Sequence, residues 1–423
     1  MRNTTLHATL AAFITDAAGR LAAETATGAE VPFEVVESEG RPGRAALYCY
    51  RPLTAIFIRQ RVGLLVALET YAAAAQALES LNGVEAYLRQ RGEPRIPGNP
   101  RERADAALRC LLDRVFDERS EFEFEEERFE AAYGELEGAL YEGRCVTTLI
   151  APLLGIALNS STRELPLGEG LSLVDGKTLD DAPPEAVWGI DGQDGSDGEE
   201  PNVLVMLSSA QDRAARAPVS EARTRFRRIL TALRLFERGG YALGPIAWTR
   251  MDAGPWRAVA LGGGGGRPRL LTLIQPAQED ELRAFCNLIA RRAPSGGEMA
   301  WALTRFELGC ERLAPFEALT DYLLALRALL EPEGPGSGRL AQRLAVICAP
   351  HEGRAALAER IAHAISLERA VIAGLAPAEP GVDALVEELA EHLRAVLRDV
   401  ICGHLDSDLR TVADELLAES VSI

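Results

Sequence analysis

The stretch VDALVEELAEHLRAVLRDVIC, from Val382 to Cys402, decides the fold of the last third of the chain. Its apolar residues recur at spacings of three and four: Leu385, Leu389, Leu393, Val396, Leu397 and Val400. Glu387, Glu391 and Arg394 lie outside this stripe. Such a stripe is typical of an amphipathic helix, and it is buried by packing helix on helix. The stretch therefore predicts one member of a helical bundle.

The same character extends back to residue 296. Amphipathic patterns predict further helices over residues 298–313, 316–330, 339–348 and 353–372. Proline and glycine separate these patterns, most clearly in the loop 331–338, which stops the preceding helix. We therefore predict an all-α, up-and-down helical bundle over residues 296–423.

Residues 1–145 combine strand and helix patterns and are predicted as a mixed α/β amino-terminal region. Two runs rich in β-branched and aromatic residues, 32–36 and 45–50, flank a turn-rich segment and predict a hairpin. Helical patterns follow over 62–90 and 102–115. The fold class expected for this part and the next is α+β.

Residues 146–295 are predicted as an α+β middle domain. Alternation of apolar and polar residues predicts one strand over 165–174 and another over 202–207. Residues 257–261 and 270–274 are expected to pair as a hairpin. Helices are predicted over 220–237 and 280–291.

Composition narrows the range of functions. A chain of 423 residues is too long for one core and predicts two or three domains. The formal net charge of −18 disfavours binding to nucleic acid and to anionic membranes, although a local basic groove remains compatible with it. The most apolar stretch, 62–78, is too short to span a membrane and carries Glu69. We expect a cytoplasmic protein without a membrane segment.

No metal site, cofactor or disulfide is expected. The seven cysteines and five histidines are scattered and form no metal-binding motif. Asp191–Gly198 lacks the ligand spacing of a calcium loop, and Gly262–Gly266 is not followed by the Lys-Ser/Thr of a phosphate-binding loop. The acidic block 117–130 contains three phenylalanines. We interpret it as a solvated face with its phenylalanines buried, with a metal or basic-partner site as the alternative.

The order of segments in the predicted bundle resembles HEPN domains of the ApeA-like type. Ala302-Leu-Thr-Arg-Phe306 resembles the start of that family's first helix, and Thr320-Asp-Tyr-Leu-Leu-Ala-Leu-Arg-Ala-Leu329 resembles its continuation. Arg339-Leu-Ala-Gln-Arg-Leu-Ala345 resembles the second helix. Ser366-Leu-Glu-Arg-Ala-Val-Ile-Ala-Gly374 falls where the family carries an Arg, a small polar residue and a His-Gly pair. The resemblance implies a HEPN-like bundle and pairing of two copies through it.

The departures from this family concern its catalytic pair. The resemblance implies an Arg-x4–6-His motif in ribonucleases, with His as general base and Arg stabilising charge on the phosphate. If Gly374 occupies the family's glycine position, Ala373 replaces the His and Glu368 replaces the Arg. Arg369 is shifted by one residue, about 100° around a helix. The expectation is a bundle without the catalytic pair.

Two other groups of residues are candidates for function. Arg398 and His404 satisfy Arg-x5-His in the last predicted helix, by chance or by function, and Gly403 could end that helix and turn His404 back. The helix 220–238 is rich in arginine, and Arg227, Arg234 and Arg238 fall on the face opposite its apolar stripe. They form either a basic ligand-binding patch or an ordinary surface balanced by carboxylates.

Three hypotheses follow. The first is a non-catalytic HEPN-like interaction or ligand-sensing protein, paired through its bundle, with a protein or a nucleotide as partner. The second is an RNA endonuclease of a toxin or antiviral-defence type that uses Arg398 and His404. The third is a nucleotide-binding regulator that uses Arg227, Arg234 and Arg238.

Overall fold

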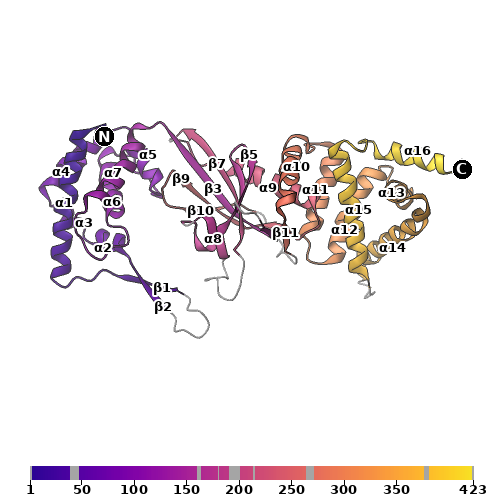
Figure 1. Cartoon of the computed structure of the whole chain (residues 1–423), viewed down its shortest axis with the longest axis horizontal. Helices are drawn as coiled ribbons and strands as arrows, with labels where there is room; N and C mark the ends of the chain where they lie inside the picture. Colours follow the sequence, from indigo (N-terminus) through magenta and orange to yellow (C-terminus); the bar gives the residue numbers. More distant parts are fainter. Residues whose placement is uncertain are drawn as a thin grey trace.

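The computed structural model describes residues 2–38, 47–159, 163–179, 181–189, 201–212, 215–262, 271–375 and 381–421. Figure 1 shows an elongated molecule with helices at both ends, a β-sheet between them and the two termini far apart. The predicted turn of the first hairpin, the tract Asp191–Gly198 and most of the glycine run at Gly262–Gly266 lie outside the described residues. An α+β portion followed by a helical carboxyl-terminal region confirms the coarse fold prediction, and the HEPN-like character of the bundle stays a prediction.

The amino-terminal region is mainly helical. Its helices are α1 (Thr4–Ala26), α2 (Thr54–Gln60), α3 (Val62–Val66), α4 (Glu69–Glu79), α5 (Val84–Gln90), α6 (Pro100–Val115) and α7 (Glu126–Tyr141). The single helix predicted over 62–90 is wrong, because α3, α4 and α5 replace it. Before α5, a Cβ at Gly83 would lie only 2.5 Å from the Leu140 Cα, so the chain passes against the backbone of α7 at this break.

The predicted hairpin and the predicted burial of phenylalanines are found in this region. Strands β1 (Phe33–Ser38) and β2 (Leu47–Pro52) pair antiparallel, with Phe33 opposite Pro52. Phe122 and Phe129, from the acidic block, are buried. The ring of Phe122 stacks on that of Phe57, with 5.2 Å between the ring centroids.

The middle of the molecule is built on an antiparallel sheet in the order β10-β9-β3-β7-β6-β5, with β8 beside β3. Its strands are β3 (Arg144–Leu154), β5 (Glu164–Gly168), β6 (Leu171–Asp175), β7 (Val203–Asp212), β8 (Ala242–Leu243), β9 (Ile246–Met251) and β10 (Arg257–Ala260). The long strand β3 pairs with both β7 and β9. Side chains alternate across it, so Leu149 and Leu153 belong to one core and Ile150 to another on the opposite face.

Helices cover both faces of this sheet. The core that contains Leu149 also takes in side chains of α9 (Val219–Phe236) and α10 (Glu279–Arg292). On the opposite face, Ile150 packs with Ala186 of the short helix α8 (Pro184–Trp188). The helices predicted over 220–237 and 280–291 are thus confirmed.

Two strand predictions for the middle region are wrong. The strand predicted over 165–174 is a hairpin of β5 and β6, which turns through the positive φ angles of Gly168 and Gly170. Residues 257–261 do not pair with residues 271–274, the described part of the second predicted strand. Instead β10 pairs with β9, and β11 (Thr272–Ile274) pairs in parallel with β4 (Ile156–Leu158), which lies far away in sequence.

The carboxyl-terminal region is entirely helical in its described residues. It comprises α11 (Gly297–Glu311), α12 (Pro315–Leu330), α13 (Leu340–Cys348), α14 (Arg354–Ile372), α15 (Val382–Cys402) and α16 (Leu409–Val421). The five predicted helices are confirmed within a few residues, and α16 was not predicted. Figure 1 shows α11, α12 and α15 next to the sheet region, with α13, α14 and α16 at the far end.

Buried apolar side chains form two large clusters. One runs from Leu6 to Ala139 and belongs to the amino-terminal helices. The other runs from Leu149 in the sheet, through Phe226 in α9, to Leu409 in α16. The middle and carboxyl-terminal parts therefore share one continuous core, while the domain boundaries proposed from the sequence stay predictions.

A buried arginine fixes the far end of the molecule. Arg343 in α13 is fully buried, and it donates to both carboxylate oxygens of Glu333 and of Asp414, each at 2.9 Å. It also donates to the main-chain oxygen of Leu330 at 2.7 Å. These bonds join the end of α12, the loop after it, α13 and α16. Among the residues that the structure describes, no helix is both long and apolar enough to cross a membrane.

Candidate functional site, a pocket between the sheet and the carboxyl-terminal helices

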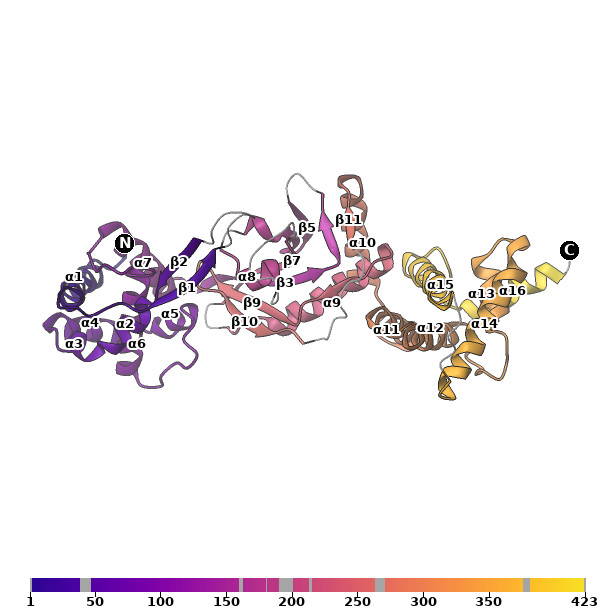
Figure 2. The same ribbon diagram turned by 90° about the horizontal axis from the view of Figure 1, so that it is seen from below.

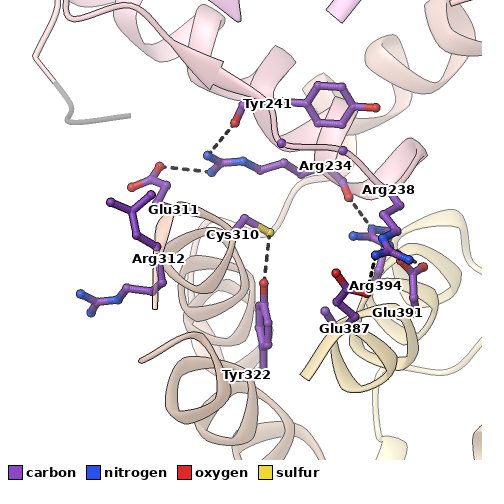
Figure 3. Close-up of a pocket in the computed structure, with 14 residues that line it drawn as sticks. Arg234, Arg238, Tyr241, Cys310, Glu311, Arg312, Tyr322, Glu387, Glu391 and Arg394 are labelled. Atoms are coloured by element: carbon purple, nitrogen blue, oxygen red, sulfur yellow. Dashed lines mark hydrogen bonds and ion pairs between the residues drawn. The ribbon is translucent and has the colours of Figure 1, made fainter. Parts of the chain in front are cut away.

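A cavity of about 180 Å³ lies where the end of α9 and the turn after it meet α11, α12 and α15 (Figure 3). Figure 2 shows these elements side by side at the centre of the carboxyl-terminal half. We call this cavity the joint pocket. The side chains labelled in Figure 3 define it: Arg234, Arg238, Tyr241, Cys310, Glu311, Arg312, Tyr322, Glu387, Glu391 and Arg394.

Arg234 is the most deeply buried charge of the joint pocket, with 3% of the residue exposed. One guanidinium nitrogen, Nη1, donates to the Glu311 carboxylate at 3.2 Å and to the Glu307 main-chain oxygen at 3.4 Å. The other, Nη2, donates to the Tyr241 main-chain oxygen at 3.2 Å. The buried Nε has no hydrogen-bond partner among the described residues. This side chain therefore keeps one unused donor in a buried position.

Arg394 of α15 lies beside Arg234. Its Nε donates to the Arg234 main-chain oxygen at 2.7 Å, and its Nη1 lies 2.5 Å from a carboxylate oxygen of Glu391. Arg394 is 8% exposed, so its placement outside the apolar stripe does not make it a surface residue. Its guanidinium carbon is 5.9 Å from the centroid of the Phe306 ring.

The rim of the joint pocket is more open. Arg238 is half-exposed and lies 2.5 Å from Glu387 and 3.9 Å from Glu391. Arg312, also partly exposed, donates from Nε to Asp321 at 2.9 Å. Four arginines and three glutamates line the cavity, and every one of these arginines has a carboxylate partner. A ligand with negative charge would compete with the exposed carboxylates of Glu387 and Glu391 at Arg238 and Arg394, whereas the partner of Arg312, Asp321, is buried.

An uncharged pair lies between the arginines. The Tyr322 hydroxyl donates to Cys310 Sγ at 3.8 Å. Burial raises the pKa of the Cys310 thiol and the pKa of Tyr322 above their usual values. Both groups therefore stay protonated at neutral pH, and a protonated thiol is a poor nucleophile. The arrangement fits binding of an anion better than covalent chemistry at Cys310.

The structure separates the three arginines proposed from the sequence. Arg234 and Arg238 come together in the joint pocket, but Arg227 is exposed on α9 and does not line it. The sequence pattern missed Arg312 and Arg394, which other helices contribute. Nothing in their local sequence marks them, because only the packing of α11 and α15 against α9 brings them to the site.

Glu368, which the HEPN resemblance would align with an arginine, is a buried ion-pair residue. It is 2% exposed and accepts two hydrogen bonds from Arg327, from Nη1 at 2.9 Å and from Nη2 at 2.5 Å. Arg369 is exposed, so the one-residue shift does place the two side chains on different faces of α14. Ala373 is exposed at the carboxyl end of that helix.

The alternative pair, Arg398 and His404, lies at the end of α15. Gly403 has a φ of 82°, ends the helix and turns the chain back, so that the His404 N–H donates to the Asp399 main-chain oxygen at 2.8 Å. The His404 ring, with 75% of the side chain exposed, has its Nδ1 3.9 Å from the Asp399 carboxylate. Among the contacts of the described residues, none joins Arg398 to His404.

No group of three or more histidine, cysteine or acidic side chains in the described ranges is placed to hold a metal ion. The six cysteines described structurally, at 110, 145, 286, 310, 348 and 402, are free thiols. The charged groups of the joint pocket that could contact a ligand are its arginines and carboxylates.

Comparison with known proteins found no relative of this chain. No protein-family model, no curated protein and no solved structure matches this chain.

Proposed function

We propose that this chain is a non-catalytic, HEPN-like interaction protein that senses a small anion in the joint pocket. The observation that carries the proposal is the buried Nε of Arg234, which has no acceptor among the described residues. A buried donor left unsatisfied costs about 1–3 kcal/mol. A carboxylate or phosphate oxygen that enters the cavity and reaches this atom would accept its hydrogen bond, and it would also interact with the rim arginine Arg238.

The position of the joint pocket is what makes it a sensing site. A ligand there would contact Arg234 of α9 and Arg394 of α15 at the same time. Binding to the folded arrangement, and not to one in which these helices separate, stabilises that arrangement according to ligand concentration. The signal would be tighter attachment of the carboxyl-terminal helices to the sheet region.

The proposed lack of catalysis rests on the family's motif positions. Glu368 is engaged by Arg327 inside the helical region, and Ala373 has no group that could transfer a proton. Pairing of two copies through the carboxyl-terminal helices belongs to the same proposal. Ile372 and Leu375, which are 72% and 64% exposed at the end of α14, offer apolar side chains for it.

Anion binding is tested by following the melting temperature of the protein with citrate and with inorganic phosphate. We expect at least one of them to raise it at millimolar concentration. Arg238→Ala should weaken the effect about tenfold, because it removes one charge-assisted interaction at the rim. Arg227→Ala is the control, because it removes an exposed arginine of α9 that does not line the pocket. A protein that responds to neither anion, or a variant that responds like the wild type, would contradict the proposal.

The endonuclease alternative has its own assay. Purified protein is incubated with mixed RNAs in the presence of a chelator. We expect no cleavage above that of a mock purification. Metal-independent cleavage that is lost in Arg398→Ala and in His404→Ala would replace the sensing proposal with the ribonuclease.

A further inference from the structure

A second hollow lies on the other side of α9, away from the joint pocket. It is a groove of about 450 Å³ between α9 and α10, closed at one end by the turn between β5 and β6. We call it the α9–α10 groove. Its volume falls within the range of roughly 300–1,000 Å³ that is usual for pockets that hold small organic ligands.

The walls of the α9–α10 groove are held by specific contacts. Arg283 of α10 donates from Nε to the Pro166 main-chain oxygen of β5 at 2.8 Å. The rings of Phe236 and Phe285 join α9 to α10, with 5.8 Å between their centroids. The closing turn is tight, since a Cβ at Gly170 would lie 2.0 Å from the Ser208 main-chain oxygen. The groove is therefore formed before any ligand enters.

The charge of the groove is strongly positive for a chain with a net charge of −18. Arg225, Arg228 and Arg291 line it, and the carboxylate of Glu169 is the one acidic group among the lining residues. Glu169 is 90% exposed and lies 3.4 Å from Arg225. The lining residues thus carry an excess of two positive charges, and Glu221, which lies outside the lining, is 3.6 Å from Arg225.

Two of these arginines have no carboxylate partner among the described residues. Arg228 makes no hydrogen bond or ion pair with any residue that the structure describes. Arg291 donates from Nε to the main-chain oxygen of Asn287, at 3.2 Å, and has no acidic partner in the same parts of the chain. This differs from the joint pocket, where each arginine already faces a carboxylate. Unpaired guanidinium groups bind phosphate oxygens in a planar, two-pronged geometry.

The floor of the groove is apolar. Its lining residues include Leu171, Ile229 and Cys286, whose exposed fractions are 8%, 4% and 4%. Burial raises the pKa of the Cys286 thiol to about 12, so it is uncharged at neutral pH. A floor of this kind favours the burial of an apolar or aromatic group beside the arginines.

We propose that the α9–α10 groove binds a phosphate monoester that carries an apolar ring, of about the size of a mononucleotide. The phosphate lies against Arg228 and Arg291, and the ring lies on the floor formed by Leu171 and Ile229. The inference is independent of the joint pocket, because the two sites share no lining residue.

Isothermal titration with four probes tests this site: adenosine monophosphate, phenyl phosphate, adenosine and inorganic phosphate. We expect the two phosphate esters to bind, and adenosine and inorganic phosphate each to bind at least about tenfold more weakly than adenosine monophosphate. No binding of either ester at millimolar concentration would overturn the proposal. Equal binding of inorganic phosphate would also overturn it, because the apolar floor would then contribute nothing.

Variants assign the binding to the groove. The double variant Arg228→Gln/Arg291→Gln changes two exposed side chains, and we expect it to bind adenosine monophosphate at least about tenfold more weakly. Arg227→Gln is the matched control, because Arg227 is the exposed neighbour of Arg228 and does not line the groove. Ala290→Trp fills the groove from α10 without altering its charge and should also abolish binding. Wild-type affinity in the double variant would overturn the assignment.

Discussion

Nε of Arg394 donates a 2.7 Å hydrogen bond to the main-chain oxygen of Arg234, a residue 160 positions earlier in the chain. Because α9 ends at Phe236, the Arg234 carbonyl belongs to the last turn of the helix, where carbonyls lack an intrahelical partner. A cationic side chain at this end also interacts favourably with the helix dipole. Arg394 of α15 thus caps α9 from the carboxyl-terminal region.

The first prediction concerns this cap. Arg394→Leu leaves the buried Arg234 carbonyl without its donor, and we expect a loss of about 1–3 kcal/mol in the free energy of unfolding. Arg238→Gln, which breaks a half-exposed ion pair in the same pocket, should lose less than about 1 kcal/mol. Urea unfolding followed by circular dichroism measures both. Equal losses of unfolding free energy in the two variants would show that the cap stabilises the protein no more than the half-exposed ion pair does.

The second prediction concerns the pair of Arg327 and Glu368. Glu368→Gln replaces the two-pronged acceptor of Arg327 with a neutral amide and leaves the buried Glu331, 3.9 Å from Arg327 Nε, as its remaining carboxylate partner. We therefore expect a loss of up to about 3 kcal/mol in stability. Arg369→Gln, on the exposed face of the same helix, should change stability by less than about 0.5 kcal/mol. The double variant Arg327→Met/Glu368→Met should regain most of the loss. A single variant as stable as the Arg369 control would refute the structural role of the pair.

The third prediction concerns pH. Burial raises the pKa of Asp113 to about 6, although Arg59 and Arg91 oppose the shift. Because the pKa of Asp113 is raised in the folded state, the contribution of its protonated form to the free energy of unfolding is complete below about pH 4. This contribution is lost as pH rises through about 6. Asp113→Asn should therefore stabilise the protein at pH 8, by up to about 3 kcal/mol, and have little effect at pH 4.

The control for this prediction is Glu102→Gln, at an exposed position of α6, the helix that also carries Asp113. This variant should not show the stabilisation at pH 8 that is expected of Asp113→Asn. Unfolding in urea at pH 4, 6 and 8 gives the comparison. A stabilisation by Asp113→Asn of the same size at all three pH values would contradict the burial argument.

The fourth prediction concerns the thiols. Burial raises the pKa of Cys110, Cys286 and Cys348 to about 12, so very little thiolate forms at pH 8. Alkylation of these residues in the folded protein should be at least about a hundredfold slower than in urea. Mass spectrometry of iodoacetamide-treated protein reads each site separately. Rapid modification of Cys286 in the folded protein would show that α10 opens readily.

The carboxyl-terminal helices could be predicted because their signal is local. The apolar stripe of α15 and the proline and glycine breaks before it specify where each helix begins and ends. The helix α1 also has buried residues at helical spacing, including Leu6, Leu10 and Phe13, so its omission from the prediction was avoidable. The helical spacing of apolar residues is sufficient to predict such helices.

The strand pairings could not be predicted in the same way. The partner of β10 is β9, and that of β11 is β4, more than a hundred residues earlier. A strand pattern shows which face is buried, but it does not show which strand lies alongside. The turn at Gly168 and Gly170 was the local feature that could have divided the strand predicted over 165–174.

The sequence predicted some of the residues of the candidate site and missed others. Arg234 and Arg238 stood out because they share the arginine-rich stretch that was predicted as a helix, although Arg238 lies in the turn after α9. Arg394 reaches the pocket only through the packing of α15 on α9. Arg228, which lies in the same arginine-rich helix, lines the α9–α10 groove instead of the joint pocket. Its lack of an acidic partner among the described residues follows from the fold, and the spacing of residues in the sequence does not show it.

The continuous core that runs from Leu149 to Leu409 also limits what can be transplanted. Grafting residues 297–421 onto another protein would leave behind Phe226 and the other α9 side chains that belong to the same core. It would also uncover Arg394, whose acceptor is in α9. The smallest portion to move as a unit therefore begins at β3, and the helical region is an extension of the sheet's own interior.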